Sequence, residues 1–230
     1  MALLESRKIF GIGLSRTGTL SLAAALTTLG IDTQHFPHDR ITADELMRGQ
    51  YDLSILRKKQ ALTDITVAPY YPQFDQVFPG SKFILTTRPK ETWLRSVENH
   101  FCMDVEHHRD EFVDFIHACV YGALHFNAAR FAHVKDLHEA NVQQFFHDRP
   151  DQLLVFDVFS GDSWEELCAY LDVPVPNHAF PHENVARTTP APSSRQPHTL
   201  WRGLGDRVKQ RHDRETDMQL EPMPKRHSQA

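Results

Sequence analysis

The chain has 230 residues, of which 40% are hydrophobic and 24% charged, and its formal net charge at pH 7 is −5. This length and balance exclude wholesale disorder and supply a core for one globular domain with a short appendage. No apolar run approaches the ~20 residues that span a bilayer, so we predict no membrane span. The slightly acidic charge gives no reason to expect a nucleic-acid partner.

The N-terminal stretch and the cysteines predict a cytoplasmic protein. Residues 1–13 lack the basic segment, long apolar core and small-residue cleavage site of a secretory leader. Cys102, Cys119 and Cys168 are an odd number without metal-ligand spacing, which is typical of reduced thiols. The 15 histidines form no H-E-x-x-H pattern, so we expect no metal site.

Apolar runs alternate with helical patterns, which indicates an α/β fold with a parallel sheet. We predict buried strands at 8–14, 61–67, 82–87 and 153–158. We predict helices at 19–29, 42–49, 70–78, 89–101, 110–147 (in two pieces around Gly122) and 163–171. In the second helix, Thr42 is expected to be the cap and Glu45 to complete a capping box.

The composition changes at residue 187. Proline and serine cluster directly after it, a short basic amphipathic stretch follows at about 200–212, and the last ten residues have no apolar pattern. We therefore predict an α/β domain over 1–186. The C-terminal extension, 187–230, is expected to be ordered in part and to end in a disordered tail.

The strongest single signal is the segment GLSRTGTLS between the first predicted strand and helix. Gly13 and Gly18 have the G-x-x-x-x-G spacing of a phosphate loop, in which backbone N–H groups converge on an anion. A nucleotide triphosphatase would continue with Lys and then Ser or Thr, but Thr19 and Leu20 stand there, and the cation, Arg16, lies inside the loop. The loop therefore suits a phosphate but not Mg²⁺-dependent transfer of a γ-phosphate. A glycine-rich turn without a ligand is the alternative.

A second basic position follows a later strand. Arg88 leaves the carboxyl end of the strand at 82–87, and Ser96 lies eight residues further on, in the next helix. Ligands of open α/β sheets bind outside the carboxyl ends of the strands, so Arg88 and the loop are expected at the same edge. An Arg and a Ser there can bind a second phosphate. Alternatively, Arg88 caps the strand and Ser96 is solvated.

These motifs resemble those of the sulfotransferases that use 3′-phosphoadenylyl sulfate. The run Arg16-Thr17-Gly18-Thr19 matches the cation, small residue and Gly-Thr of the family's 5′-phosphosulfate loop. Arg88 and Ser96 match its 3′-phosphate motif. The stretches FPGSKFILTTRPKETWLRSV and LLVFDVFSGDSWEELCAYL resemble the branch with RTGT-x-SL loops, so the resemblance covers about residues 8–185.

The resemblance implies a P-loop-like fold of three layers, α/β/α, and an enzyme. Its reaction would move a sulfuryl group from 3′-phosphoadenylyl sulfate to a hydroxyl or amine of a small-molecule acceptor, in line and without a metal. The product would be adenosine 3′,5′-bisphosphate. The residues expected to bind the donor are those of the loop and the second motif: Ser15, Arg16, Thr17, Gly18, Thr19, Leu20, Ser21, Arg88 and Ser96.

Two positions differ from the cytosolic members of that family, and both bear on catalysis. Arg16 stands where those enzymes carry Lys, and Asp64 stands where a strand of theirs ends in His. Arg16 is expected to stabilise charge on the departing phosphate, since a guanidinium stays protonated. Asp64 is expected to accept the acceptor's proton, with His100 and Asp104 as alternative bases. A structural role for Asp64 is a further alternative.

The acceptor is harder to read from the sequence. A set of aromatic residues either lines an apolar cavity or packs as core, which leaves an apolar alcohol open: Phe101, Phe112, Phe115, Tyr121 and Phe126. Two other functions remain: a P-loop nucleotide kinase, and a non-catalytic nucleotide-binding domain that has kept the fold. The sequence leaves a homodimer open.

Overall fold

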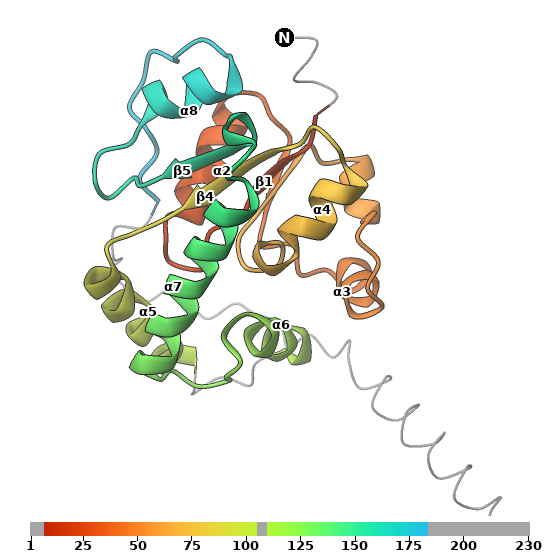
Figure 1. The fold of residues 1–230 in the computed structure, drawn as a ribbon, viewed down its shortest axis with the longest axis vertical. Coiled ribbons are helices and arrows are strands. Elements are labelled where there is room, and N and C mark those ends of the chain that lie inside the picture. Colours follow the sequence, from red (N-terminus) through yellow and green to blue (C-terminus); the bar gives the residue numbers. More distant parts are fainter. Residues whose placement is uncertain (1–6, 105–109, 184–230) are drawn as a thin grey trace, which may run out of the picture. The chain divides into compact units, whose positions relative to one another are not determined.

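The computed structural model describes residues 7–104 and 110–183, which form a parallel sheet with helices on both faces (Figure 1). The sheet has the strand order β2-β3-β1-β4-β5. Its strands are β1 (Ile9–Gly11), β2 (Thr33–His35), β3 (Ala61–Thr63), β4 (Lys82–Thr86) and β5 (Leu153–Phe156). The helices are α2 (Thr19–Thr28), α3 (Arg40–Met47), α4 (Tyr71–Val77), α5 (Lys90–Asp104), α6 (Glu111–Tyr121), α7 (Ala128–Phe145) and α8 (Trp164–Leu171).

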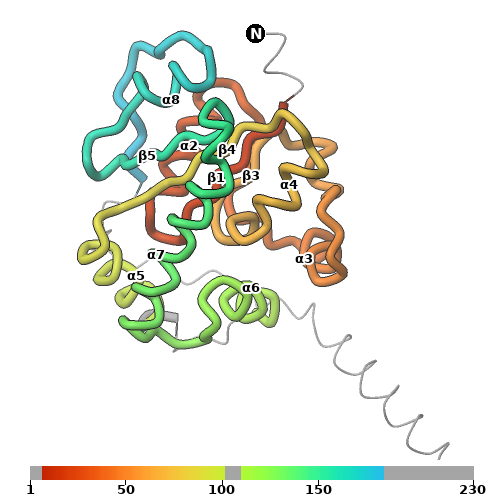
Figure 2. Tube along the Cα trace, viewed as in Figure 1, coloured from red at the N-terminus to blue at the C-terminus, as the bar shows by residue number. Residues whose placement is uncertain are grey.

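Alternation along the strands produces the three predicted layers. Ile9 belongs to a buried cluster with apolar residues of α2 and α8. The next residue, Phe10, faces the other way and stacks on Phe74 of α4, with ring centroids 4.6 Å apart. Phe83 of β4 meets Phe146, just beyond α7, in the same layer. In Figure 2, α7 crosses in front of the strands and α2 lies behind them. The predicted fold class is confirmed.

The first strands are shorter than predicted because the chain leaves the sheet in strained turns. β1 stops at Gly11 and β3 at Thr63, whereas apolar residues continue to positions 14 and 67. Beyond these ends, Arg16 has φ 70° and Asp64 has φ 87°. Such left-handed conformations are costly for residues other than glycine, so surrounding contacts must hold them.

Two details of the prediction are wrong. Thr42 does not cap α3: the Asp39 side chain accepts hydrogen bonds from the backbone N–H groups of Ile41 and Thr42, so the helix begins earlier. Glu45 instead accepts from the backbone N–H of Ser54, at 3.0 Å. Strand β5 is not fully buried, since it is an edge strand of the sheet and Val155 is 43% exposed.

The aromatic residues of α5, α6 and α7 form core. Phe101 and Tyr121 are buried and meet at Phe131, with ring centroids 5.0 and 4.3 Å from it. Phe126 lies against Phe131 as well, and Phe112 stacks on Phe115. Core packing therefore explains Phe101, Phe112 and Tyr121, which are buried, whereas Phe115 and Phe126 are half-buried against other aromatic rings.

Several expectations fall on residues that are not described or concern features of the whole chain. The extension 187–230, with its basic stretch, lies outside the described residues. Within the described ranges, no helix is long and apolar enough to cross a membrane. The same ranges contain no group of three or more His, Cys, Asp or Glu side chains arranged to hold a metal ion.

The cap of α3 gives a stability test. Asp39→Ala removes the hydrogen bonds to the Ile41 and Thr42 amides and a third from the Thr42 hydroxyl, and should lower the free energy of unfolding by about 1 kcal/mol or more. Asp44→Ala, the control, removes only an exposed ion pair with Arg48 and should cost about 0.5 kcal/mol or less. Urea unfolding measures both. Equal losses would show that Asp39 is not the cap.

Candidate active site

The loop after β1 is held tightly against β4. The Thr17 hydroxyl donates to the backbone oxygen of Leu14 at 2.6 Å and lies 2.7 Å from the Thr86 hydroxyl. Because Thr17 has a single hydroxyl proton, Thr86 is the donor of the second bond. Gly13 makes this approach possible: a Cβ there would lie 1.9 Å from Thr86 Oγ1. On the other side, the Trp93 indole N–H donates to the backbone oxygen of Ser15 at 2.9 Å.

The start of α2 presents free backbone donors. The first hydrogen bond of this helix runs from the Leu22 N–H to the Gly18 oxygen, so the amides from Gly18 to Ser21 have no partner within the helix. Gly18 has φ 99°, which turns the chain into the helix, and no side chain caps it. Converging amides and the positive end of the helix dipole favour an anion at this point.

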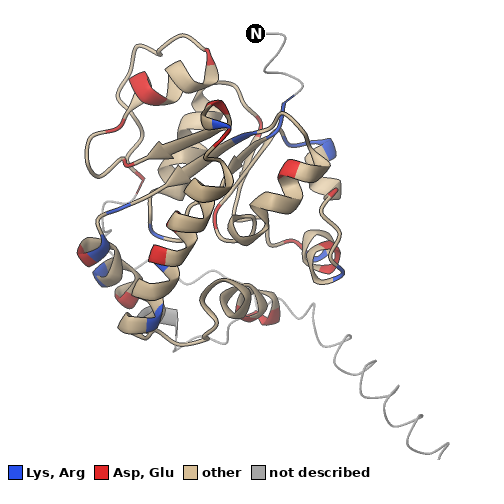
Figure 3. Cartoon of the chain, in the orientation of Figure 1, with Lys and Arg blue, Asp and Glu red and all other residues tan. Residues whose placement is uncertain are grey.

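Three predicted side chains meet beside this helix start. Arg16 Nε donates to Ser96 Oγ at 3.1 Å, and Arg88 Nη1 lies 3.4 Å from the backbone oxygen of Arg16. The Arg88 guanidinium also stacks on the exposed ring of Phe159, 4.1 Å from its centroid. In Figure 3, basic residues mark the loop after β1 and the segment leading into α5. The two motifs predicted from the sequence therefore form one continuous cluster.

Within the described part of the chain, the positive charge of the cluster is only partly offset. Partial burial lowers the pKa of Arg88, and the nearby charges of Arg16 and Arg95 lower it further, while Asp157 offsets part of the effect. Within the described ranges, no carboxylate forms an ion pair with Arg16 or Arg88. A bound anion would relieve this repulsion, since opposite charge stabilises the protonated form.

Asp64 lies on the adjoining side of the loop, where its carboxylate is fixed by three donors. Oδ1 accepts from Ser15 Oγ at 3.0 Å and from the Ile65 N–H at 2.7 Å. Oδ2 lies 3.2 Å from Nε2 of His35. The Tyr121 hydroxyl is fully buried; burial raises its pKa, the charge of Asp64 raises it further, and the nearby Ser15 offsets part of this rise.

The remaining predicted residues divide into buried and exposed positions. Thr17, Thr19 and Ser21 are buried, and Ser21 Oγ accepts from the Glu183 N–H at 3.1 Å. Leu20 is partly exposed. Of the alternative bases, His100 is half-buried on α5 and contacts the Phe101 ring edge-on, whereas the side chain of Asp104 lies outside the described residues.

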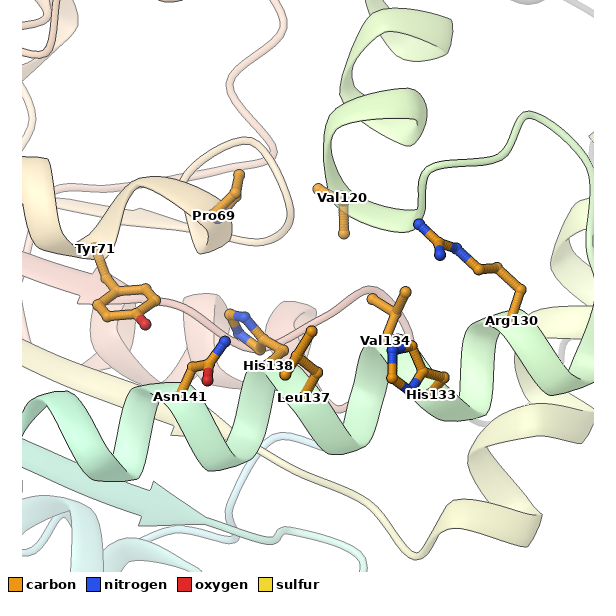
Figure 4. A pocket seen from close by; sticks show the side chains of 9 residues that line it. All are labelled: Pro69, Tyr71, Val120, Arg130, His133, Val134, Leu137, His138 and Asn141. Carbon is orange, nitrogen blue, oxygen red and sulfur yellow. The ribbon is translucent and has the colours of Figure 1, made fainter.

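A cavity of about 290 Å³ lies between α7, the end of α6 and the turn before α4 (Figure 4). Its lining combines apolar and polar side chains: Pro69, Tyr71, Val120, Arg130, His133, Val134, Leu137, His138 and Asn141. His138 connects this cavity to the loop, because its Nε2–H donates to the backbone oxygen of Ile12 at 2.8 Å. Burial lowers the pKa of His138.

Sequence reasoning missed three side chains of the site, His35, Trp93 and Phe159, and it named Tyr121 only as a residue of an apolar acceptor cavity or of the core. Trp93 and Tyr121 occur in the predicted apolar patterns, which indicated packing but not their polar ends. His35 ends a strand that was not predicted. The signal available for it was the position after the helix stop at Gly30, where a βαβ unit requires a second strand.

Comparisons with known proteins found a family, a relative and a fold that resemble this chain. The family model described as "Sulfotransferase domain" matches residues 8–189. The chain is 25% identical to Ava biosynthesis cluster protein M from Aspergillus versicolor, over 76% of this chain and 80% of that protein. It is similar in fold to a sulfotransferase from Alicyclobacillus acidocaldarius, with TM-score 0.50, 15% identity and coverage of 76% and 84% of the two chains.

The fold is a parallel α/β sheet with a glycine-containing loop and a helix start after its central strand. The match of the family model over most of the chain shows that it belongs to the sulfotransferase domain family. The resemblance inferred from the loop and strand-end motifs is thereby confirmed at the level of the family.

Gly13→Ala tests the contact between the loop and β4. Its Cβ would collide with Thr86 Oγ1 and the Thr86 backbone oxygen, so we expect a loss of about 2 kcal/mol or more in urea unfolding. Gly49→Ala is the control: it strains a positive φ of 69° but meets open space, and should cost about 1 kcal/mol. A Gly13→Ala protein as stable as the wild type would contradict the close approach.

Proposed function

We propose that the chain is a sulfotransferase that uses 3′-phosphoadenylyl sulfate and passes its sulfuryl group to a hydroxyl or amine of a small molecule. The observation that carries the proposal is the single cluster of Arg16, Arg88 and Ser96 beside the free amides of α2. A donor with phosphates at both its 5′ and 3′ positions matches a site with two guanidinium groups, a hydroxyl and a helix start.

The residues present fit such a donor. Gly13 and Gly18 leave the loop without side chains at these two positions, and the guanidinium groups of Arg16 and Arg88 supply positive charge for an anion. When bound, the donor supplies the sulfuryl group: a bond from the acceptor oxygen or nitrogen to sulfur forms while the bond from sulfur to the bridging phosphate oxygen breaks. We propose that the loop amides and the start of α2, from Gly18 to Ser21, hold the 5′ side of the donor. Arg88 and Ser96 hold its 3′-phosphate.

Arg16 and Asp64 are proposed as the catalytic residues. The Arg16 guanidinium stabilises the negative charge that collects on the departing phosphate oxygen, and it does so as a fixed cation without donating its proton. The Asp64 carboxylate accepts the proton that the acceptor loses. Ser15 links the two functions, because it belongs to the loop and its hydroxyl donates to Asp64.

Donor binding is the first test. Isothermal titration calorimetry with adenosine 3′,5′-bisphosphate, in EDTA, should show tight binding by the wild type. Arg88→Ala should weaken it about 30-fold, or about 2 kcal/mol, because a charge-assisted contact is lost. Arg48→Ala, an equal change of charge on the exposed end of α3, is the control and should bind as the wild type does. Binding of ATP with Mg²⁺ in place of the bisphosphate would favour the kinase alternative instead.

Transfer is the second test, measured with ³⁵S-labelled donor and a panel of phenols, aliphatic alcohols and primary amines. Arg16→Ala should lose about 100-fold or more in kcat, and Arg16→Lys should keep part of the activity. Asp64→Asn should lower kcat by about 100-fold or more while calorimetric binding of the bisphosphate is unchanged.

Donor binding without transfer to any acceptor in the panel would contradict the proposal that the chain is an enzyme. It would favour the alternative of a non-catalytic nucleotide-binding domain. Wild-type turnover in Asp64→Asn would place the base elsewhere.

A further inference from the structure

We propose that His35 is a positioning residue that orients Asp64 as the base, an inference that rests on the sulfuryl transfer proposed above. His35 is the last residue of β2, and it pairs in register with Thr63, the last residue of β3. Asp64 follows directly. The parallel register thus brings the imidazole to the carboxylate, with Nδ1 3.0 Å from Thr63 Oγ1 and Nε2 3.2 Å from Asp64 Oδ2.

The hydrogen-bond chemistry fixes the direction of each bond. An ionised carboxylate can only accept, so Nε2 of His35 carries a proton and donates to Asp64 Oδ2. In the neutral ring, Nδ1 must then accept, and the Thr63 hydroxyl is its donor. Thr63 is fully buried, so this nitrogen faces a protein hydroxyl and not an acceptor molecule. His35 therefore acts through Asp64.

Counting the hydrogen bonds to each oxygen of the Asp64 carboxylate identifies the oxygen that takes up the proton. Asp64 Oδ1 accepts two hydrogen bonds, from Ser15 Oγ and the Ile65 N–H, which occupy its lone pairs. Oδ2 accepts one, from His35, and keeps a lone pair. The proton that leaves the acceptor therefore goes to Oδ2, the atom whose direction the imidazole sets. Without His35, the carboxylate could still turn about the bonds to Oδ1.

The backbone supports a functional reading of this pair. Phe36, next to His35, has φ 43°, and Asp64 has φ 87°; both are left-handed conformations that are costly for residues other than glycine. Backbone hydrogen bonds hold both residues there: Phe36 N–H donates to the Thr63 oxygen at 2.9 Å, and Asp64 N–H to the Gly11 oxygen at 3.0 Å. The strain is thus retained where two strand ends bring an imidazole and a carboxylate together.

The first test reads the imidazole in the absence of donor and acceptor. In ¹⁵N NMR of histidine-labelled protein, the His35 signals are identified as those that disappear in His35→Gln. We expect proton occupancy at Nε2 at every pH, with Nδ1 unprotonated in the neutral ring. A neutral ring protonated at Nδ1 would overturn the proposal, because it could not donate to the carboxylate.

The second test separates positioning from folding. His35→Phe should lower kcat about 10-fold or more, with the KM for donor and the calorimetric affinity for adenosine 3′,5′-bisphosphate unchanged. His35→Gln can still offer an N–H to Oδ2 and should recover most of the loss. His147→Phe alters an exposed histidine just beyond α7 and is the control, expected at wild-type activity.

The outcomes distinguish this inference from the proposed function. A wild type that transfers no sulfuryl group overturns the function, and the role of His35 in it, whatever the variants do. An active wild type with an equally active His35→Phe overturns the role of His35 alone. Equal losses of kcat in His35→Phe and His35→Gln would also overturn the role of His35. They would show that restoring an N–H donor does not restore activity, as expected of a purely structural defect.

Discussion

The contact between the loop after β1 and the end of β4 is the constraint on which the site depends. It consists of the Thr17 and Thr86 hydroxyls, 2.7 Å apart, and of Gly13, whose missing side chain leaves room for Thr86. Because β4 continues directly into Arg88 and α5, this one contact also sets where the second cation and Ser96 lie relative to Arg16. A buried hydroxyl pair is a rigid device for this purpose, since breaking it leaves unpaired polar groups in the core.

Strain and charge are both concentrated at the carboxyl edge of the sheet. Arg16, Phe36 and Asp64 are three of the non-glycine residues with positive φ, and they follow the three adjacent strands β1, β2 and β3. Arg16 and Arg88 lie close together without a carboxylate partner in the described part of the chain. Both features cost stability in the free protein. A bound anion would offset the part of this cost that comes from repulsion between the two guanidinium groups. Such a cost in the free protein is expected of a preorganised site.

The parts of the site that depend on local sequence pattern could be predicted from the sequence. The glycine spacing around Arg16, and the eight-residue step from Arg88 to Ser96, follow from a loop and a helix start and need no tertiary information. The predicted cap of α3 is wrong because Asp39 and Thr42 are both good capping residues. Only the structure shows that Thr42 is buried inside the helix.

His35 could not be predicted as a site residue for a different reason. Strand β2 is three residues long and reads Thr-Gln-His, with no apolar alternation to mark it as a strand. Its pairing with β3 joins positions 28 residues apart, so the contact with Asp64 depends on the sheet register alone. The polar ends of Trp93 and Tyr121 were hidden in the same way, because apolar periodicity reports burial and not what a buried N–H or O–H meets.

The most direct test of the central claim is a crystal structure of the chain with adenosine 3′,5′-bisphosphate. The account predicts the 5′-phosphate on the amides of the α2 start, within hydrogen-bond distance of the loop, and the 3′-phosphate against Arg88 and Ser96. A nucleotide bound elsewhere, with both guanidinium groups left facing solvent, would contradict it.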